Sequence, residues 1–575
     1  MSGMRAQGSS LWLFWLVALL ILGAGLGLRD PWPSDEPRFA LVARQMVESG
    51  NWWFPHRGSE LYSDKPPMLM WWQAALYSVL GNWRVAFLLP SLLAALVTLG
   101  CVYDLGRRLW NRQVGLYAAW GLLLALQFVF QSKKAQIDPL VMMFITVANY
   151  GLLRHLLLGP AWRWWALGWF AAGLGVITKG VGVLALLMLV PAALASLAGW
   201  RGVRVHAGNP RFWLGPVCFL LAIGLWLVPV AVQALATGLP EYRAYLDDIL
   251  LRQTAKRYAQ SWDHHQPLWY FLGTMATMWL PTLLLLPWAV PAWWRRLRRR
   301  DARYLLPLAW WALLLLFFSI PDGKRDVYIL PALPMVCLAL APLAAGLLRR
   351  RDVQALLALV AGVVSLALLA AGLAVLGGEP GFETRLVAQR GISAGQVTAL
   401  AWCVLAMGAG GMAGLLWFGW RNAHKAWVLL LGVVWVVYGL LAYPLLNDSS
   451  SARGVMTRAG QLVGPQAELA LVGWKEQNLL MADRPVRDFG FKRDWLLQLD
   501  DALQWQDQHA ARRWLLLQQP LMLSCIDREQ ALFVGTANRR QWWLVPADAV
   551  HRPCQASAAD RQQVRQAQGP ADDEL

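Results

Sequence analysis

Charged side chains are scarce in this chain of 575 residues: Asp, Glu, Lys and Arg together make up 15% of it, whereas 57% is hydrophobic. The mean hydropathy is +0.40. Such a composition excludes an ordinary soluble globular protein of this length. Apolar stretches of about 17–25 residues, long enough to cross a bilayer as helices, recur from residue 11 to residue 445. The sequence therefore predicts an all-α polytopic membrane protein.

Acidic residues are the scarcer charge: 34 Asp and Glu stand against 52 Lys and Arg, a net charge of +18. The basic residues lie mostly in short blocks between apolar stretches, a pattern of membrane topology rather than of nucleic-acid binding. Internal repeats and low-complexity tracts are not evident. Of only six cysteines, four lie inside apolar runs and are expected to be core residues. Cys525 and Cys554 lie in the tail and could pair if the tail is outside the cytosol.

The N-terminus lacks a small-residue cleavage site, so we interpret Leu11–Leu28 as a retained first span. We expect thirteen spans, of which the division of 162–199 into two is the least distinct. Their approximate ranges are 11–28, 84–105, 113–130, 139–157, 162–178, 181–199, 212–235, 267–293, 304–320, 327–347, 353–377, 395–420 and 426–445.

Alternate loops are basic and poor in acids, as in "GRRLWNRQ" and "WWRRLRRRDAR". The positive-inside rule assigns these loops, and the N-terminus, to the cytoplasm. Segments 29–83 and 236–266, which are rich in aromatic and mixed-charge residues, are then outside. An odd number of spans also sends residues 446–575 outside. We expect this tail to form a small periplasmic α/β domain whose end, 556–575, is disordered.

The first outer loop predicts two amphipathic helices on the membrane surface. In the first helix Ser34 can be the N-cap, Pro37 lies in the first turn and Gly50 can end the helix. Its apolar positions share one face: Phe39, Val42, Ala43, Met46 and Val47. The second helix is expected at about 67–80, after "DKPP".

Individually, the polar residues of the outer loops have ordinary explanations. Asp35 and Glu36 suit the N-terminus of a helix dipole, Lys65 can extend to the membrane interface, and Asp138 can cap a span. Together they indicate chemistry, because acids and bases from separate loops can converge on one acidic, lipid-linked substrate. A phosphate partly out of water needs several Lys or Arg donors, and a carboxylate beside it can accept a proton from a hydroxyl.

Six segments resemble, in order, the membrane glycosyltransferases of the GT-C class. They are "SDEPRFALVARQMVESGNWWFP", "LYSDKPPMLMWW", "QIDPLVMMF", "GVITKGVGVLAL", "HQPLWYFL" and "GKRDVYILPALP". The closest likeness is to the bacterial aminoarabinose–lipid A transferases, relatives of the protein O-mannosyltransferases, and it covers roughly residues 10–345. The later spans and the tail fit the layout of this group but carry little motif.

This resemblance implies a GT-C fold for residues 1–445 and a place in the bacterial inner membrane. It also implies an enzyme that transfers a sugar from a polyprenyl-phosphate donor to lipid A or another envelope acceptor, by a direct displacement that inverts the anomeric configuration. It implies catalytic roles for Asp35, Glu36 and Asp138. The residues it places around the donor are Arg38, Lys65, Lys179, Arg257, Lys324 and Tyr328. Arg325 and Asp326 depart from the pattern, because relatives are often less charged there, and they leave the sugar and acceptor open.

Some relatives carry a metal near this loop, for which Asp64 and His264 or His265 are the available ligands. Two adjacent histidines without a clear third partner are weak support, so we predict no metal and no required cofactor. A protein O-mannosyltransferase-like activity is the nearest rival. A lipid flippase is another alternative, but it predicts charges at mid-span and two similar halves, whereas the sequence has few charges deep in the spans and no symmetry between its halves. A non-catalytic scaffold would not need this concentration of acids and bases.

Overall fold

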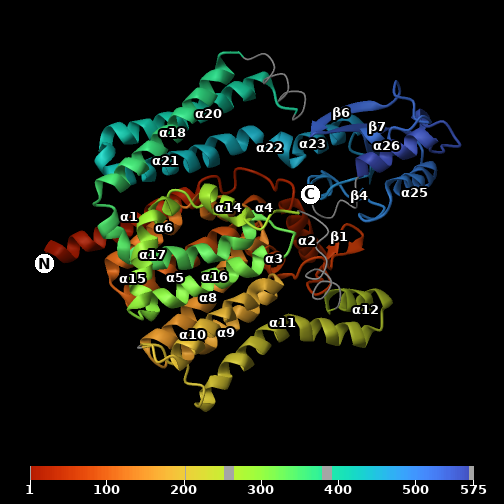
Figure 1. Ribbon diagram of the computed structural model, residues 1–575. Helices are drawn as coiled ribbons and strands as arrows, with labels where there is room; N and C mark the ends of the chain where they lie inside the picture. Colours follow the sequence, from red (N-terminus) through yellow and green to blue (C-terminus); the bar gives the residue numbers. More distant parts are fainter. Residues whose placement is uncertain (1, 201, 251–264, 379–390, 569–575) are drawn as a thin grey trace.

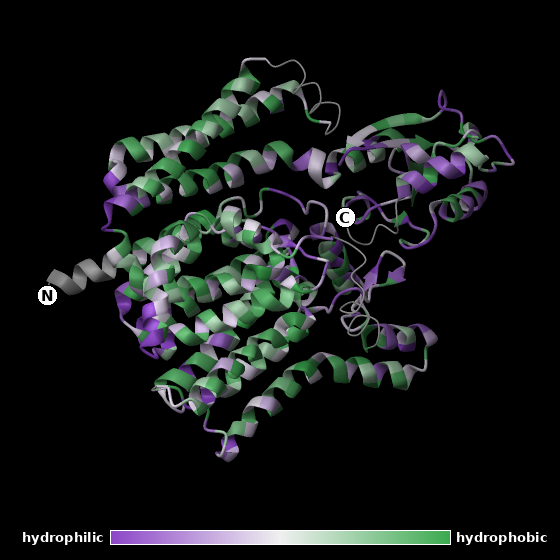
Figure 2. Cartoon of the chain, viewed as in Figure 1, coloured by the Kyte–Doolittle hydropathy of each residue, from purple (hydrophilic) through white to green (hydrophobic). Residues whose placement is uncertain are grey.

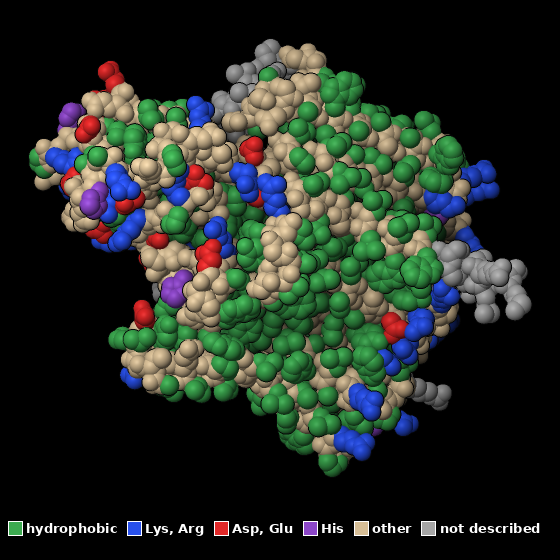
Figure 3. Space-filling view, turned by 180° about the vertical axis from the view of Figure 1, so that it is seen from behind, with side chains coloured by type: hydrophobic (Ala, Val, Ile, Leu, Met, Phe, Trp, Pro, Cys, Tyr) green, Lys and Arg blue, Asp and Glu red, His purple; other side chains and the backbone are tan. Residues whose placement is uncertain are grey.

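The computed structural model describes residues 2–200, 202–250, 265–378 and 391–568. Long helices run beside one another through most of the molecule, and a smaller domain with a sheet lies at one end of them (Figure 1). Apolar residues dominate the helices, whereas hydrophilic residues gather at the two ends of the bundle (Figure 2). Seen from behind, the end away from the small domain carries mainly Lys and Arg (Figure 3). A polytopic helical membrane protein is thereby confirmed.

The first group of helices forms the main bundle, whose core includes the fully buried Trp165, Trp279 and Trp310. Four 3-10 helices, η1 (Gly180–Met188), η2 (Pro210–Trp213), η4 (Thr282–Leu285) and η5 (Asp326–Ala332), precede α10, α11, α15 and α17. The helices are α1 (Ser2–Gly23), α5 (Leu89–Leu109), α6 (Arg112–Leu124), α7 (Leu126–Ser132), α8 (Ile137–Leu158), α9 (Trp162–Val176), α10 (Leu189–Leu197), α11 (Leu214–Thr237), α14 (Tyr270–Met278), α15 (Leu286–Arg298), α16 (Ala302–Ser319) and α17 (Leu333–Leu347).

A second group lies along one side of this bundle (Figure 1). It consists of α18 (Arg351–Leu376), α20 (Ala394–Phe418) and α21 (Ala423–Val437), with η6 (Trp420–Asn422) between the last two. A short π-helix, η7 (Tyr438–Ala442), continues α21 into α22 (Tyr443–Ser451), which leads to the small domain.

The predicted number of spans is not established. Among the described residues nine helices are long and apolar enough to cross a membrane, or eleven if each of two bent pairs counts as one span. The two expected segments outside this set are the short α9 and α1, whose apolar part is Ser10–Gly23. The expected division of 162–199 is present: α9 ends before Ile177, and η1 begins at Gly180. Glycine lets these two helices approach, since a Cβ on Gly182 would collide with the backbone of Gly175.

Two segments that are each expected to be a single span consist of two helices with a bend between them. The α6–α7 pair bends by 68°, and the pair formed by α14 and Thr282–Arg298 bends by 101°. The two breaks meet, because the N–H of Leu126 donates to the carbonyl of Leu280 at 3.2 Å and the indole of Trp279 donates to Gln127 at 2.7 Å. Interrupted helices are tolerated at membrane depth only when freed backbone groups find such partners.

The two predicted helices of the first outer loop are confirmed as α2 (Glu36–Ser49) and α3 (Met68–Leu80). Gly50 ends α2 at a φ of 71°, which favours glycine. Between them β1 (His56–Arg57) and β2 (Glu60–Leu61) form a short hairpin, and α4 (Trp83–Ala86) follows α3. One face of α2 packs on the outer-loop core as predicted, but Ala40 and Leu41 on the other side pack against the small domain. The helix is therefore enclosed rather than lying free on the membrane surface.

The small domain has the predicted α/β composition. Its five-stranded sheet has the order β4-β3-β5-β7-β6, with parallel pairing among β4, β3 and β5 and antiparallel pairing beyond. The crossover helix α25 explains the parallel pair β3–β5, and positive φ at Asn538 and Arg539 gives the tight turn between β6 and β7. The elements are α23 (Arg453–Val463), β3 (Glu468–Val472), α24 (Glu476–Leu480), β4 (Val486–Arg487), α25 (Trp495–Asp507), β5 (Arg513–Gln518), η8 (Gln519–Leu521), β6 (Leu532–Ala537), β7 (Arg540–Val545), η9 (Ala547–Ala549) and α26 (Ala558–Gln568).

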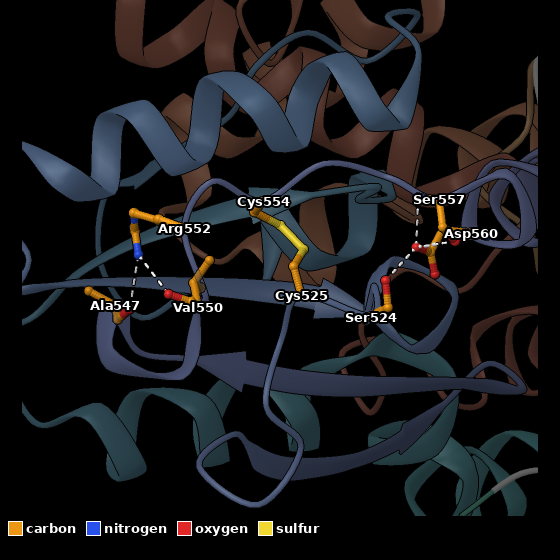
Figure 4. Close-up of a disulfide and its surroundings, with 8 residues drawn as sticks. All are labelled: Ser524, Cys525, Ala547, Val550, Arg552, Cys554, Ser557 and Asp560. Carbon is orange, nitrogen blue, oxygen red and sulfur yellow. Dashed lines mark hydrogen bonds between the residues drawn. A yellow bond between two sulfur atoms is a disulfide. The ribbon is translucent and has the colours of Figure 1, made fainter.

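The end of this domain is more ordered than expected. Ala558–Gln568 of the stretch expected to be disordered forms helix α26, with Val564 buried in the domain core. Asp560 in its first turn accepts hydrogen bonds from the hydroxyls of Ser524 (2.9 Å) and Ser557 (2.7 Å), which attach the helix to the domain (Figure 4). The sequence does not predict this helix because Val564 is a single buried position in a stretch of polar composition. Residues 569–575 lie outside the described part of the chain.

A disulfide joins Cys525 to Cys554 close to these bonds (Figure 4). Because it closes a loop of 29 residues, the double variant Cys525→Ala/Cys554→Ala should lose about 2–4 kcal/mol of domain stability, measured as a lower urea midpoint. Cys218→Ala, which removes an unpaired cysteine of α11, is the control. An unchanged midpoint in the double variant would contradict the stabilising role.

Candidate functional site

Asp35 occupies the N-cap position of α2 without making a capping hydrogen bond. Instead its Oδ2 accepts a hydrogen bond from the side chain of Gln136 at 2.9 Å and lies 3.9 Å from Nη2 of Arg325. The Asp35 side chain is 20% exposed. The carboxylate therefore joins the starts of α2 and α8 to the segment before η5 while still meeting solvent.

Glu36 is the neighbouring acid, but it is buried. The Arg29 guanidinium forms a two-point ion pair with its carboxylate, in which Nη2 donates to Oε1 at 2.7 Å. The backbone N–H groups of Trp32 and Ala135 donate to the same carboxylate at 2.9 Å each. Four donors thus hold the carboxylate, which places the N-terminus of α2 against the segment that leads into α8.

Arg29 and Asp30 have no predicted role, yet they anchor the site. Asp30 is 1% exposed and accepts hydrogen bonds from Arg84 at 3.0 Å, Arg453 at 2.6 Å and Asn447 at 2.8 Å. Burial alone raises the pKa of the Asp30 carboxyl, but hydrogen bonds from Arg453, Arg84 and Asn447 outweigh it and lower the pKa to about 2. The segment after α1 is thereby attached to α4, α22 and α23. The "LRDP" stretch after the first span is the only signal of this role in the sequence.

Asp138, Lys179 and Tyr328 form a second group. Asp138 lies in the first turn of α8 and accepts a hydrogen bond from Nζ of Lys179 at 2.9 Å. Lys179 is the N-cap residue of η1, and its ammonium lies 4.8 Å from the centre of the Tyr328 ring on η5. Two side chains predicted from separate loops as functional therefore meet, and Asp138 and Lys179 keep 14% and 23% exposure.

Lys324 precedes η5 and is nearly buried, at 3% exposure. Its ammonium donates to the carbonyl of Gln266 at 2.9 Å, so it attaches the end of the 236–266 loop to η5. The start of η5 is held in turn by Gln127, whose amide donates to the carbonyl of Asp326 at 2.7 Å. The bent pairs of spans therefore position the segment that carries Arg325 and Tyr328.

Lys65 is half-buried in the loop between β2 and α3, directly after Asp64. Asp64 accepts a hydrogen bond from Nζ of Lys492, a residue of the small domain, at 3.0 Å, and lies 3.6 Å from Arg57. Burial alone raises the pKa of the Asp64 carboxyl, but Lys492 and Arg57 outweigh it and lower the pKa. The carboxylate before Lys65 is therefore fixed between two cations.

Arg38 is buried on α2, where its Nε donates to Oε1 of Glu476 at 3.2 Å. Burial alone lowers the pKa of Arg38, but the surrounding Tyr62, Glu476, Asp35 and Asp64 raise it overall. Arg38 thus lies within electrostatic reach of the carboxylates at both ends of the outer loop, although its guanidinium is bound to the small domain.

Arg257 and His264 lie outside the described residues. His265 forms an isolated bridge with Gly323. The described part of the chain contains no group of three or more His, Cys, Asp or Glu side chains that could hold a metal ion. Asp64, the other ligand considered from the sequence, lies between Arg57 and Lys492, which is an unfavourable place for a cation.

Lys134 is a further residue near Asp35 without a predicted role. It is half-buried, with its ammonium 3.8 Å from the centre of the Phe130 ring. Burial lowers its pKa, while Glu36, Asp326 and Asp35 act in the opposite direction. The paired lysines of "SKKAQID" are a sequence signal that could have pointed to it.

Comparisons with known proteins show what this chain resembles. A family model described as dolichyl-phosphate-mannose-protein mannosyltransferase matches residues 64–228. A protein of Pectobacterium carotovorum, named undecaprenyl phosphate-alpha-4-amino-4-deoxy-L-arabinose arabinosyl transferase, is 30% identical over 345 residues, 58% of each chain. A protein of that name from Sodalis glossinidius is 32% identical over 352 residues, which cover 58% of this chain and 59% of that one. The chain thus spans less than two thirds of the curated relatives it matches.

Among solved structures, ArnT from Cupriavidus metallidurans bound to undecaprenyl phosphate is similar over 94% of this chain and 99% of that chain, with a TM-score of 0.72 and 20% identity. This likeness shows that the chain shares the fold of that structure. The predicted resemblance to the GT-C class, and within it to the aminoarabinose transferase group, is therefore confirmed.

The Arg29–Glu36 pair has a matched surface control on the same helix. Glu36→Gln leaves Arg29 without its buried counter-charge and should cost about 3–5 kcal/mol of stability. Glu48→Gln removes the exposed partner of Arg44 and should cost about 0–1 kcal/mol. Thermal unfolding of both variants in detergent tests the difference; equal losses would contradict a structural role for the buried pair.

The lowered pKa of Asp30 predicts a pH dependence. The ordinary value is 3.8 and the folded value is about 2, so the ionised Asp30 stabilises the fold above pH 4, and this contribution is lost as the pH falls toward 2. Asp30→Asn should therefore be less stable than wild type at pH 7, and the gap should close between pH 4 and 2. A stability gap that stays constant over this range would contradict the assignment.

Proposed function

We propose that the protein transfers a sugar from a polyprenyl-phosphate donor to an envelope acceptor of the lipid A type, on the periplasmic face of a bacterial inner membrane. The observation that carries the proposal is the carboxylate of Asp35, which is 20% exposed and lies 3.9 Å from Arg325, in a group of charges drawn from α2, α8, η1 and η5. The reaction is a single displacement that inverts the configuration at the anomeric carbon.

The leaving group in this reaction is a lipid phosphate, which needs charge stabilisation rather than protonation. We assign this task to Lys65, Lys179 and Arg257, with Tyr328 beside Lys179. One well-placed donor contributes about 3 kcal/mol in a transition state. The lysines present compact charges on flexible stems, which suit a phosphate that arrives and departs.

Asp35 acts on the acceptor. If the acceptor is a hydroxyl, Asp35 accepts its proton as the bond to the sugar forms; if the acceptor is itself a phosphate, Asp35 orients it or binds the sugar, because a phosphate needs no base. We assign Glu36 and Lys324 positioning roles, since buried partners hold both. Asp138 orients Lys179 through their 2.9 Å hydrogen bond.

The proposed location follows from charge and redox chemistry. The basic loops favour a cytoplasmic N-terminus, and the Cys525–Cys554 disulfide favours an oxidising compartment for the small domain. We propose that residues 1–445 form the membrane transferase domain and residues 446–575 the periplasmic domain. This arrangement puts Asp35 and Lys65 on the side where a lipid-linked envelope substrate is accessible.

The names of the sequence relatives support an aminoarabinose donor, whereas the family model at residues 64–228 supports a protein acceptor as the second candidate. Purified protein incubated with a radiolabelled polyprenyl-phosphate sugar and either lipid A or a protein acceptor separates the two. We expect label in lipid A. Label in the protein acceptor alone would favour the second candidate, and lipid translocation without transfer would contradict both.

The role of Asp35 can be tested by a substitution that removes only the charge of its side chain. Asp35→Asn keeps the size of the side chain and its contact with Gln136, but removes the negative charge. If Asp35 is a general base, the rate of transfer should fall roughly 10²- to 10⁴-fold. Glu48→Gln, an equivalent change on the exposed side of α2, should leave transfer unchanged. Near wild-type transfer by Asp35→Asn would contradict a catalytic role for this carboxylate.

A further inference from the structure

The small domain contributes a buried carboxylate to the outer loop. Glu476 is the first residue of α24, and its side chain is only 5% exposed. Its Oε1 accepts the hydrogen bond from Arg38 at 3.2 Å and lies 3.7 Å from Nη1 of Arg57. One carboxylate from the domain thus lies between two buried guanidinium groups of the first outer loop.

The two arginines lie near different parts of the proposed site, Arg38 near Asp35 and Arg57 near Asp64 and Lys65. Arg38 is three residues after Asp35 on α2, and the electrostatic influence of Asp35 reaches it. Arg57 lies 3.6 Å from Asp64, the residue before Lys65. Glu476 is therefore connected through Arg38 to Asp35, the carboxylate that we assign to the acceptor, and through Arg57 and Asp64 to Lys65, the lysine that we assign to the donor phosphate.

Other contacts hold the same surfaces together. The ring of Phe491, also in the small domain, lies with its centre 3.9 Å from the Arg57 guanidinium. The hydroxyl of Ser59 donates to Asp488 at 2.7 Å. Gly58 has no room for a side chain, because a Cβ there would lie 2.8 Å from the Trp474 ring. The small domain therefore packs against the β1–β2 hairpin, and Glu476 is a buried anion in the interface between them.

We propose that Glu476 is a positioning residue, through which the small domain sets the distance between Asp35 and Lys65. The proposal rests on the proposed transfer reaction for its activity readout. Without Glu476, Arg38 and Arg57 become adjacent buried cations with one fewer counter-charge, and they must separate or move toward Asp35 and Asp64. Because a misplacement of about 1 Å can slow a reaction about 10²-fold, this movement is sufficient to impair transfer.

The charge and the volume of the side chain can be separated by two variants. Glu476→Gln keeps the shape and removes the charge, whereas Glu476→Asp keeps the charge and shortens the side chain. If Glu476 merely fills space, Gln should serve at least as well as Asp. For a positioning charge we expect kcat/KM for the donor to fall roughly 10- to 100-fold in Glu476→Gln and Glu476→Asp to recover most of the loss. A ranking with Gln equal to or above Asp overturns the proposal.

A matched control lies in the same domain. Glu468 on β3 is 44% exposed and pairs at 2.9 Å with Arg513, a residue of the small domain itself. In the full-length protein, Glu476→Gln should accelerate amide hydrogen exchange in residues 36–49 and 56–66, while Glu468→Gln should not. Unchanged exchange in both segments of Glu476→Gln also overturns the proposal. This readout is independent of transfer, so an inactive wild-type protein would refute the proposed function and leave the exchange test valid.

Should Glu476→Gln fail to fold, the double variant Arg57→Met/Glu476→Met takes its place, because it removes one cation together with the anion. We expect a folded protein with faster exchange at 56–66 and slowed transfer. Exchange and transfer equal to those of wild type would overturn the proposal.

Discussion

The structure depends on how charges are compensated at the edge of the bilayer, immediately after the first helix. A buried charge there requires an opposite charge or several hydrogen bonds, and Arg29 and Asp30 place two such charges side by side. Arg29 is satisfied by Glu36 and by the carbonyl of Lys133 at 3.0 Å, and Asp30 by Arg453, Arg84 and Asn447. Since these partners come from α2, the α7–α8 connection, α4, α22 and α23, the first outer loop, the bundle and the small domain are joined at a single point.

That requirement gives two adjacent acids different functions. Glu36 is surrounded by four donors and nearly excluded from water, so its carboxylate fixes the start of α2. Asp35, one residue earlier, turns toward Gln136 and Arg325 and keeps contact with solvent. The rigid neighbour orients the accessible one, which is the arrangement that precise placement of a reacting group requires.

Much of this architecture can be predicted from local sequence. The apolar runs locate the helices, and Pro37 and Gly50 place the ends of α2, because these features act within one element. The bends at Ala125 and Leu280 escape prediction because each break is compensated by the other, more than 150 residues away. The convergence of Asp138, Lys179 and Tyr328 follows from outer loops alone, whereas the partners of Glu36 and Arg38 do not, because Arg29 and Glu476 are recognisable as partners only in three dimensions. The helix at 558–568 escapes prediction because a single buried Val564 leaves almost no apolar pattern.

The charged residues near Asp35 form two groups, a buried inner layer and a partly exposed outer layer. This difference in burial limits where a substrate can bind. Arg29, Arg38, Arg57 and Lys324 are buried against partners of the protein itself, so an arriving anion would have to break a buried pair, at a high cost. Arg325 is 39% exposed and 3.9 Å from Asp35, and Lys179 is 23% exposed, so a phosphate can reach both from solvent while water hydrates the carboxylates beside them. The inner layer therefore keeps the geometry constant, and the outer layer is where an anionic lipid substrate can be bound and released.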